Sequence, residues 1–193
     1  MTNIEQFSDM QLRPRLLAAY DGTVSPEETF HKQLDAIAQS GYSNLRSYAN
    51  CCRSTYMAIT CHLSVPSPEV VRSTATLAGG IAGTGETCGA VLGGLIAIGE
   101  AVGANARWDT QADAKSIEAA KAFVKAFTGN FTSTRCLAIQ RYVMGGLCCD
   151  DPSKVQSWIE AEGPRGCALV CAEAARIAAR ILLSGEANSD SDA

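Results

Sequence analysis

Residues 76–104 read TLAGGIAGTGETCGAVLGGLIAIGEAVGA, and this stretch restricts the fold more than any other part of the chain. Its two charged residues, Glu86 and Glu100, enclose an apolar run of 13 residues at 87–99. A helix that spans the hydrocarbon of a bilayer needs about 20 such residues. The stretch therefore predicts no membrane span, and we expect instead a buried central helix.

Glycines recur at every fourth position of this stretch. Gly85, Gly89 and Gly93 would lie on one face of the helix and would let neighbouring backbones approach closely. Each glycine lowers helix propensity by about 1 kcal/mol relative to alanine. Such a cost indicates close packing, and we expect this face to provide room for a bound group.

The same glycines invite comparison with nucleotide-binding loops. Residues 80–87 have the glycine spacing of a P-loop, but Glu86 stands where the phosphate-binding lysine would be. A negative charge at that position opposes an anion. The GxGxxG fingerprint fails as well, because its third glycine and a preceding strand are both missing. We therefore expect no nucleotide site here.

The rest of the chain carries helical patterns. Ala, Leu, Glu, Lys and Arg recur at spacings of three and four, and alternating runs of Val, Ile and Thr are missing. Ser25-Pro26-Glu27-Glu28 predicts a helix start, for a helix that Gly41 ends, and Ser67-Pro68-Glu69 predicts another start. The sequence thus predicts an all-α protein, a compact multi-helix bundle around the buried glycine-rich central helix.

Start and stop signals give the remaining helices. Breaks are expected at Gly129, at Gly145-Gly146 and at Glu162-Gly163-Pro164. No internal repeat and no linker divides the chain, so residues 1–193 are expected to form a single helical domain with a disordered tail at 187–193. The predicted helices cover about residues 44–62, 109–127, 133–144, 152–161 and 166–184.

Composition and charge exclude several classes of protein. With 193 residues, 47% of them apolar and 19% charged, the chain has the composition of one folded, globular domain. Sixteen basic and 20 acidic residues give a net charge of −4, and no basic stripe is present, so we expect no nucleic-acid partner. Residues 1–20 lack the apolar run of a secretory signal, which favours a cytoplasmic location.

Nine cysteines against two histidines are the anomaly of the composition. An odd count in a chain of this length does not fit a secreted disulfide scaffold, whereas in a reducing cytoplasm thiols persist and serve metal binding or redox chemistry. His31 and His62 have few neighbours of ligand type, so we expect them to be structural or surface residues. No CxxC, CxxCH or HExxH is present, so any metal site must be assembled by folding, and covalent haem is not expected.

Three cysteines lie in the first turn of a predicted helix. Cys88, Cys136 and Cys167 would each meet the unpaired amides and the positive dipole end there, which lower a thiol's pKa from about 8.5. Any one of them, taken alone, fits a small core residue better, but three repeats of one placement favour chemistry. Cys51, inside the predicted helix 44–62, would complete a four-thiolate set for an iron-sulfur cluster or a tetrahedral metal.

The other cysteines are less informative. Cys171 lies one turn after Cys167 and would be an additional ligand, a resolving thiol or a core residue. Cys52 and Cys61 are expected in the core. Cys148-Cys149 falls in a glycine-containing loop, where we expect enough exposure for oxidation, although neighbouring cysteines form a disulfide only with strain.

The order of these cysteines resembles a known family. Residues 88–93 read CGAVLG, which fits CGAxxG and resembles the signature of the C_GCAxxG_C_C family of redox-active proteins. The segments around Cys51, Cys136 and Cys167 resemble the family's other cysteine segments, over about residues 45–183. The resemblance implies a small helical protein whose four matched cysteines carry redox chemistry or a cluster. Split-Soret cytochromes share part of this pattern but add haem sites that this chain lacks, and Cys52 replaces the family's usual small residue.

Three functions from different classes remain open. The leading hypothesis is an iron-sulfur cluster held by the four matched cysteines beside Gly85, Gly89 and Gly93, for electron transfer or redox sensing with a redox partner protein. The second is a metal-free thiol-disulfide oxidoreductase in which Cys88 attacks as a low-pKa thiolate. The third is a structural module that holds zinc and packs against a partner or, as a homodimer, against a second copy. The metal ligands expected in the first are Cys51, Cys88, Cys136 and Cys167, with Cys171 as an additional candidate.

Overall fold

The computed structural model describes residues 26–184, and the regular elements of this part of the chain are helices. The prediction of an all-α bundle is confirmed. The expected signal-free start and the expected disordered tail both lie outside the described residues. The elements are α2 (Pro26–Tyr48), α3 (Cys51–Leu63), α4 (Pro68–Ser73), η2 (Thr74–Leu77), α5 (Gly89–Val102), α6 (Thr110–Phe131), α7 (Cys136–Val143), η3 (Pro152–Lys154), α8 (Val155–Glu160) and α9 (Gly163–Ser184).

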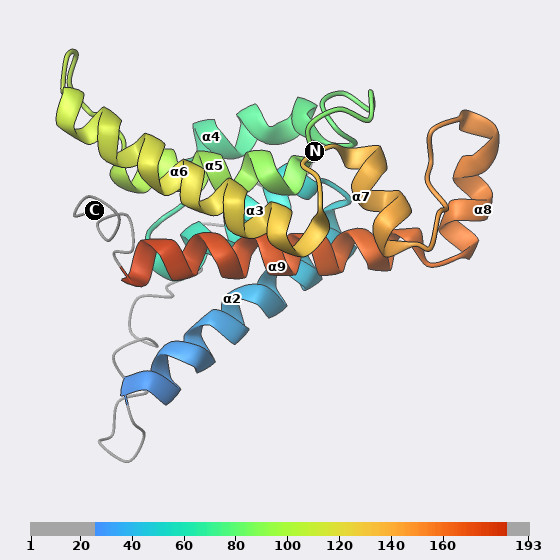
Figure 1. The fold of residues 1–193 in the computed structure, drawn as a ribbon, viewed down its shortest axis with the longest axis horizontal. Helices are drawn as coiled ribbons and strands as arrows, with labels where there is room; N and C mark the ends of the chain where they lie inside the picture. The colour runs from blue at the N-terminus through green and yellow to red at the C-terminus, as the bar shows by residue number, and fades with distance from the viewer. Residues whose placement is uncertain (1–25, 185–193) are drawn as a thin grey trace.

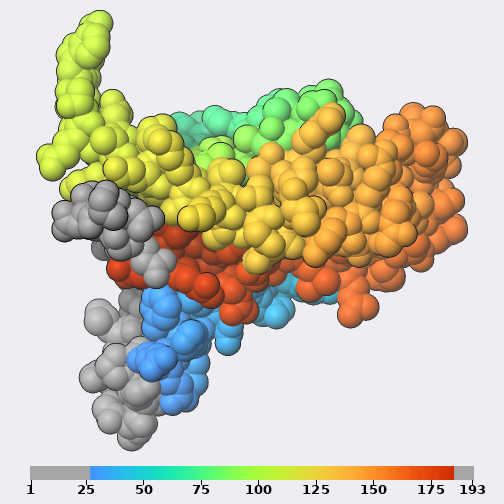
Figure 2. Space-filling model, viewed as in Figure 1, coloured from blue at the N-terminus to red at the C-terminus, as the bar shows by residue number. Residues whose placement is uncertain are grey.

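Helix α9 runs along the length of the bundle and organises it (Figure 1). Helix α2 packs against one side of α9, while α3, α5 and α6 pack against it from the other side. The shorter helices α7 and α8 stand together at one end (Figure 1). In the space-filling view the segment between α5 and α6 projects from the opposite end (Figure 2). The glycine-rich helix α5 is buried between α3, α6 and α9, as the sequence predicts.

Aromatic and small residues fill the core of the bundle. On α6, Phe123, Phe127 and Phe131 follow one another at one-turn intervals, with ring centroids 6.0 and 4.7 Å apart. Phe123 reaches α5 at Gly94, where a Cβ atom would lie 2.5 Å from the phenyl ring. The facing side of α9 is alanine-rich and fully buried, which allows several helices to approach it closely.

The predicted division of the first two helices is wrong. Gly41 does not end α2, because its missing side chain is needed for packing instead: a Cβ there would lie 2.9 Å from the Cys171 carbonyl oxygen on α9. The chain breaks at Ala49, whose φ is +51°, and Asn50 caps α3 by accepting the Arg53 N–H at 3.0 Å. Cys51 is therefore the first residue of a helix and not part of a helix interior.

The glycine-rich stretch is only half helical. Residues 79–83 have consecutive positive φ values of 65, 72, 61, 51 and 77°, and Gly85 follows at 77°, so this part is a left-handed loop. The placement of Gly85 on a helix face is thus wrong, whereas Gly89 and Gly93 lie on α5 and face α3. Gly129, a further predicted break, lies inside α6, while Gly145 and Gly146 do follow the end of α7.

The length and apolar character of the described helices determine whether any of them could cross a bilayer. Within residues 26–184, none of them combines the length and the apolar character that a membrane crossing requires.

A half-buried histidine, His62, makes the stability of the bundle depend on pH. Ser40 on α2 and His62 on α3 form a 2.8 Å hydrogen bond, and burial lowers the pKa of His62 below its ordinary 6.5. Since the unfolded chain then binds the proton more readily, this contribution to stability is full above pH 6.5 and is lost as the pH falls through the lowered pKa. We expect urea unfolding at pH 7.5 and 5.5 to show a smaller stability difference in His62→Gln than in the parent chain. An unchanged pH difference would contradict this role.

Candidate cysteine-lined redox site

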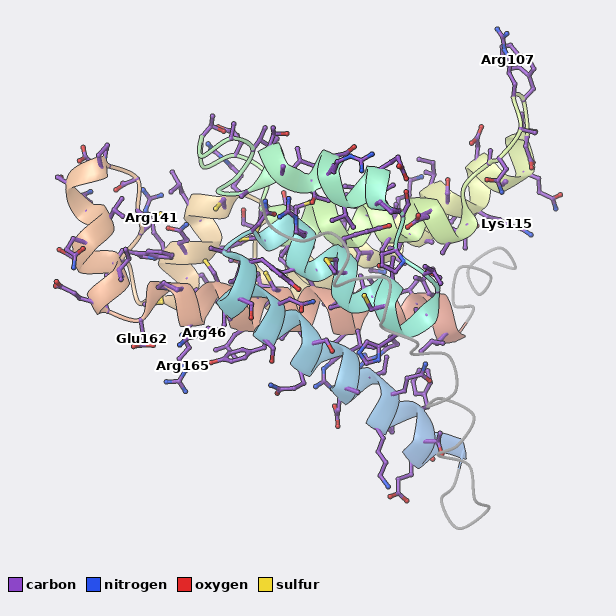
Figure 3. All side chains as sticks on the ribbon, turned by 180° about the vertical axis from the view of Figure 1, so that it is seen from behind. Arg46, Arg107, Lys115, Arg141, Glu162 and Arg165 are labelled. Carbon is purple, nitrogen blue, oxygen red and sulfur yellow. The ribbon has the colours of Figure 1, made fainter. Side chains whose placement is uncertain are left out.

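Six of the nine cysteines line one cavity of about 600 Å³ between α2, α3, α5, α7, α8 and α9. This cavity lies toward the end of the bundle where α7 and α8 stand, and Figure 3 shows the labelled Arg46, Glu162 and Arg165 close together at that end. The six comprise all four cysteines expected as ligands, together with two more. They are Cys51, Cys88, Cys136, Cys149, Cys167 and Cys171.

A short backbone pairing brings Cys88 and Cys136 side by side. Thr87 and Arg135 form an isolated antiparallel bridge, next to which the Cys136 N–H donates to the Glu86 carbonyl at 2.6 Å. The Glu86 and Arg135 side chains form an ion pair at 3.1 Å over the same pairing. Cys88 is the N-cap of α5 and Cys136 is the first residue of α7, so the pairing joins two helix starts. The two thiols are hydrogen-bonded to each other.

Cys51 forms a second set with Cys167 and Cys171. The two α9 thiols lie one turn apart and donate hydrogen bonds to the Cys51 sulfur, and the Gly79 amide of the left-handed loop donates to it as well. The Cys171 thiol also lies 3.7 Å from the Cys51 carbonyl oxygen. These donors hold the pKa of Cys51 well below its usual value in spite of burial. The same contacts, with burial, raise the pKa values of Cys167 and Cys171.

In the Cys88–Cys136 pair, Cys136 is the thiol with the lowered pKa. The Cys88 thiol donates to it, and the buried Gln140 side chain adds a weaker donor, with Nε2 3.5 Å from Cys136 Sγ, so the pKa of Cys136 is lowered. The pKa of Cys88 is raised well above its usual value, first by that hydrogen bond and then by burial. The structure therefore differs from the expectation that Cys88 is the low-pKa thiol, because a neighbouring thiol decides the matter and the helix start does not.

The two sets of thiols are electrostatically coupled. Negative charge on Cys51 contributes to the raised pKa of Cys88 and opposes the lowering at Cys136. Cys51 and Cys136 are thus the cavity thiols whose pKa values are lowered, and negative charge on one disfavours negative charge on the other. Positive charge placed between them would relieve this repulsion.

Glycines bring the backbones that carry these sulfurs into contact. A Cβ atom at Gly89 would lie 2.9 Å from the Cys52 amide nitrogen and 3.0 Å from Cys51 Cβ. At Gly80 it would lie 2.6 Å from Cys136 Cβ. Gly80 was not among the predicted site residues, because its closeness to Cys136 on α7 depends on the tertiary fold. The expectation that Gly85, Gly89 and Gly93 leave room for a bound group is wrong: Gly85 packs against Leu137, Gly89 and Gly93 pack against the α3 backbone, and none of the three lines the cavity.

The remaining cysteines divide differently from the prediction. Cys52 is fully buried in the core, where desolvation raises its pKa to about 12, and Cys61 packs against the core, both as expected. Cys148 is buried rather than exposed, with 4% of its surface accessible. Cys149 is half-buried and lines the cavity, a position that its loop sequence did not indicate.

The donor arrangement is not that of a single-ion site. Within residues 26–184, no three His, Cys, Asp or Glu side chains converge closely enough to hold one metal ion. Around zinc, with Zn–S bonds of about 2.3 Å, tetrahedral thiolates lie only about 3.8 Å apart. Here the thiols line one cavity in two hydrogen-bonded sets, Cys88 with Cys136 and Cys51 with Cys167 and Cys171.

Comparison with protein families adds a finding that agrees with this geometry. The family model described as "Putative redox-active protein (C_GCAxxG_C_C)" matches residues 49–181. The chain belongs to this family. The match to C_GCAxxG_C_C confirms the resemblance seen in the sequence and spans the elements from α3 through most of α9, which include all six cavity cysteines. Among characterised proteins and among solved structures, neither search finds a significant match.

In the C_GCAxxG_C_C signature, glycine precedes the central cysteine. In this chain the order is reversed, as Cys88-Gly89. The structure explains why the second position is glycine here. The backbone of α3 passes so close to Gly89 that no side chain fits between them. Cysteine at the N-cap position, one residue earlier, instead lines the cavity.

Gln140 is expected to influence which thiol of the Cys88–Cys136 pair ionises. Replacing it in Gln140→Leu removes the amide donor to Cys136 Sγ, so the pKa of Cys136 should rise. The measurement is the pH dependence of iodoacetamide labelling at Cys136, resolved by peptide mass spectrometry in the reduced chain. Gln156→Leu, on the exposed surface of α8, is the matched control. A labelling profile identical to that of the control would show that the amide has no such effect.

Proposed function

We propose that this chain binds an iron-sulfur cluster through Cys51, Cys88, Cys136 and Cys167 and serves in electron transfer or redox sensing. The observation that carries the proposal is the convergence of these four cysteines, from α3, α5, α7 and α9, on one cavity. Thiolates are the ligands that iron-sulfur clusters use, and four are the usual number. A bound cluster would supply one-electron chemistry inside the bundle.

Charge supports a cationic occupant. Cys51 and Cys136 are the thiols whose pKa values are lowered, and the negative charge on Cys51 raises the pKa of Cys88 and Cys167. Ionisation of all four together is therefore opposed by their mutual repulsion, which positive charge would relieve. Iron ions would provide that charge and would deprotonate the remaining two thiols.

The spread of the thiols supports a cluster over a single ion. The two sets line the same cavity, and among residues 26–184 no three ligand side chains lie close enough together for one ion. In a cluster, several iron and sulfide atoms lie between the thiolates, so its ligands stand farther apart than around one zinc ion. The donor arrangement thus fits the first hypothesis better than the zinc-holding module.

Backbone amides would set the potential of such a group. The Gly79 amide already donates to Cys51 Sγ, from a loop whose left-handed backbone directs it toward the cavity. Hydrogen bonds to the sulfurs of a cluster stabilise its reduced, more negative state and raise its reduction potential. Burial, with Cys88 only 5% and Cys136 only 4% accessible, limits contact with solvent.

Anaerobic isolation tests the proposal directly. The full chain is purified without oxygen, reconstituted with iron and sulfide, and analysed for iron, acid-labile sulfide and visible absorption. We expect iron and sulfide in stoichiometric amounts with the sulfur-to-iron charge-transfer bands of a cluster. Folded protein that retains neither after reconstitution would overturn the proposal.

A second function is favoured by one specific contact. The hydrogen-bonded Cys88 and Cys136 thiols would, in the cluster-free chain, form a disulfide by passing two electrons and two protons to an acceptor disulfide. Their helix starts are held together by the backbone bridge, so little movement is needed. Thiol trapping across a redox titration should then show one reversible Cys88–Cys136 disulfide. Independent alkylation of both thiols at all potentials would exclude it.

A further inference from the structure

The cavity extends beyond the five sulfurs that Cys51, Cys88, Cys136, Cys167 and Cys171 contribute. Another part of it is lined by apolar side chains from α7, α8 and α9, with the Trp158 indole among them. At about 600 Å³ the whole cavity falls in the size range that holds small organic molecules. The apolar side chains of this part are Ile139, Val143, Trp158, Ile159 and Val170.

A sixth thiol, Cys149, lines the cavity from the segment between α7 and η3. It is half-buried and is not among the four proposed cluster ligands. The Cys149 thiol and its backbone N–H both donate to Gln140 Oε1, at 3.1 and 2.9 Å. Its position is thus held by two hydrogen bonds to one buried side chain.

The Gln140 side chain lies between the Cys149 thiol and the Cys136 thiol. Its Oε1 accepts from Cys149 while its Nε2 donates to Cys136 Sγ at 3.5 Å, so a single side-chain amide separates the two sulfurs. Gln140 is itself 4% accessible, and it lines the cavity. Cys149 and Cys136 therefore lie near each other on the same wall.

We propose that the part of the cavity lined by α7, α8 and α9 binds a small organic disulfide, that Cys149 attacks it, and that Cys136 resolves the product. The inference rests on the redox role proposed for this cavity. A cavity of about 600 Å³ has the size that small organic molecules fill, and its lining is mostly apolar, with Arg46 and Glu162 as its charged residues.

The exchange balances in two steps. Deprotonated Cys149 Sγ attacks one sulfur of RSSR, forming a Cys149–SR bond as the original S–S bond breaks, and RS⁻ leaves and takes up the proton that Cys149 released. Deprotonated Cys136 Sγ then attacks Cys149 Sγ, the Cys136–Cys149 disulfide forms, and a second RS⁻ leaves and is protonated. The protein loses two electrons and two protons, and two RSH molecules carry them. With Cys136 bound to iron, the reaction stops after the first step.

The test uses the full chain, reduced and freed of iron, with bis(2-hydroxyethyl) disulfide as the uncharged probe. We expect peptide mass spectrometry to find a Cys136–Cys149 disulfide in the parent chain. In Cys136→Ser we expect the probe's mixed disulfide to accumulate at Cys149, at least about tenfold above that at Cys148. Cys61→Ser is the control and should behave as the parent chain, and circular dichroism reports whether each variant is folded.

Two results would overturn the proposal. One is a Cys149 that stays reduced while the probe reacts at other cysteines. The other is a parent chain in which Cys136 pairs with a different cysteine, such as the Cys88 partner of the second function above, which this proposal excludes; that measurement does not depend on any variant folding. Iron and sulfide are measured in Cys149→Ser after reconstitution, where we expect parental amounts. A chain that never binds iron would overturn the proposed cluster but leave the Cys149 result standing, so the two failures are distinguishable.

Discussion

Cys51→Ala should reduce the bound iron and acid-labile sulfide of the reconstituted chain to background. Cys51 is the sulfur to which the Cys167 and Cys171 thiols and the Gly79 amide all donate, and it carries a pKa well below the usual value. Its removal deletes the thiol whose pKa is lowered by three donors and leaves Cys136 as the other cavity thiol with a lowered pKa. Three remaining cysteines with one lowered pKa are a poor site for a cluster that takes four ligands. The measurement is iron and sulfide per chain, with visible absorption, after anaerobic reconstitution.

Cys61→Ala is the matched control on the same helix. Cys61 is half-buried against the core and does not line the cavity, so its replacement should leave the iron and sulfide content at the parental value. Unfolding by urea identifies any loss of iron that follows from loss of the fold. Full iron and sulfide in Cys51→Ala would contradict its role as a ligand.

The sequence was informative where a local pattern has one meaning. Ser67, followed by proline, does cap α4, and its side chain accepts the Val70 N–H at 3.4 Å. Cys88 and Cys136 do lie at helix starts, after the extended Thr87–Arg135 bridge, whereas the prediction for Cys167 is wrong, because α9 begins at Gly163 and Cys167 is its fifth residue. Such signals act within a few residues of each other and need no knowledge of the rest of the fold.

Glycine was ambiguous for a physical reason. The same residue type ends helices, admits left-handed backbone and allows close packing, and only the surroundings decide between these uses. Gly41 packs against α9 inside a helix, Gly85 has a φ of +77° in a loop, and Gly145 follows a helix end. The break before Cys51 came from Ala49 in left-handed conformation, which alanine rarely adopts and the sequence does not announce.

The ionisation of the thiols also depends on tertiary contacts. Helix starts lower a thiol's pKa in general, yet Cys88 at a helix start has a raised pKa, because its thiol donates a hydrogen bond to Cys136 and is buried. Cys149 is held at the site by its hydrogen bond to Gln140, which lies nine residues earlier on α7. Neither relation can be read from spacing, since both depend on which side chains meet across the cavity.

The left-handed loop shows how the fold supports the site. Ile81 and Ala82 have φ values of +61° and +51°, a conformation that costs non-glycine residues roughly 1–2 kcal/mol each. The loop is held by backbone hydrogen bonds, among them those from Gly85 N–H to Gly79 O and from Glu86 N–H to Gly80 O, both 3.0 Å. It places the Gly79 amide against Cys51 and Gly80 against Cys136. The strained backbone thus connects the two sets of thiols.

Gly93→Ala should destabilise the chain by about 1–3 kcal/mol, the range for overpacking a well-filled core. A Cβ at Gly93 would collide with the Cys52 carbonyl oxygen and lie 3.0 Å from the Tyr56 amide nitrogen, and both atoms are backbone of α3 that cannot turn aside. Helix α3 would have to shift, and Cys51 would shift with it.

Gly99→Ala is the control on the same helix. A Cβ there would meet no neighbouring element within 4 Å, so helix propensity alone should stabilise the chain by roughly 0.5–1 kcal/mol. Urea unfolding followed by circular dichroism measures both, and equal stability of Gly93→Ala and the parent chain would refute the close contact between α3 and α5.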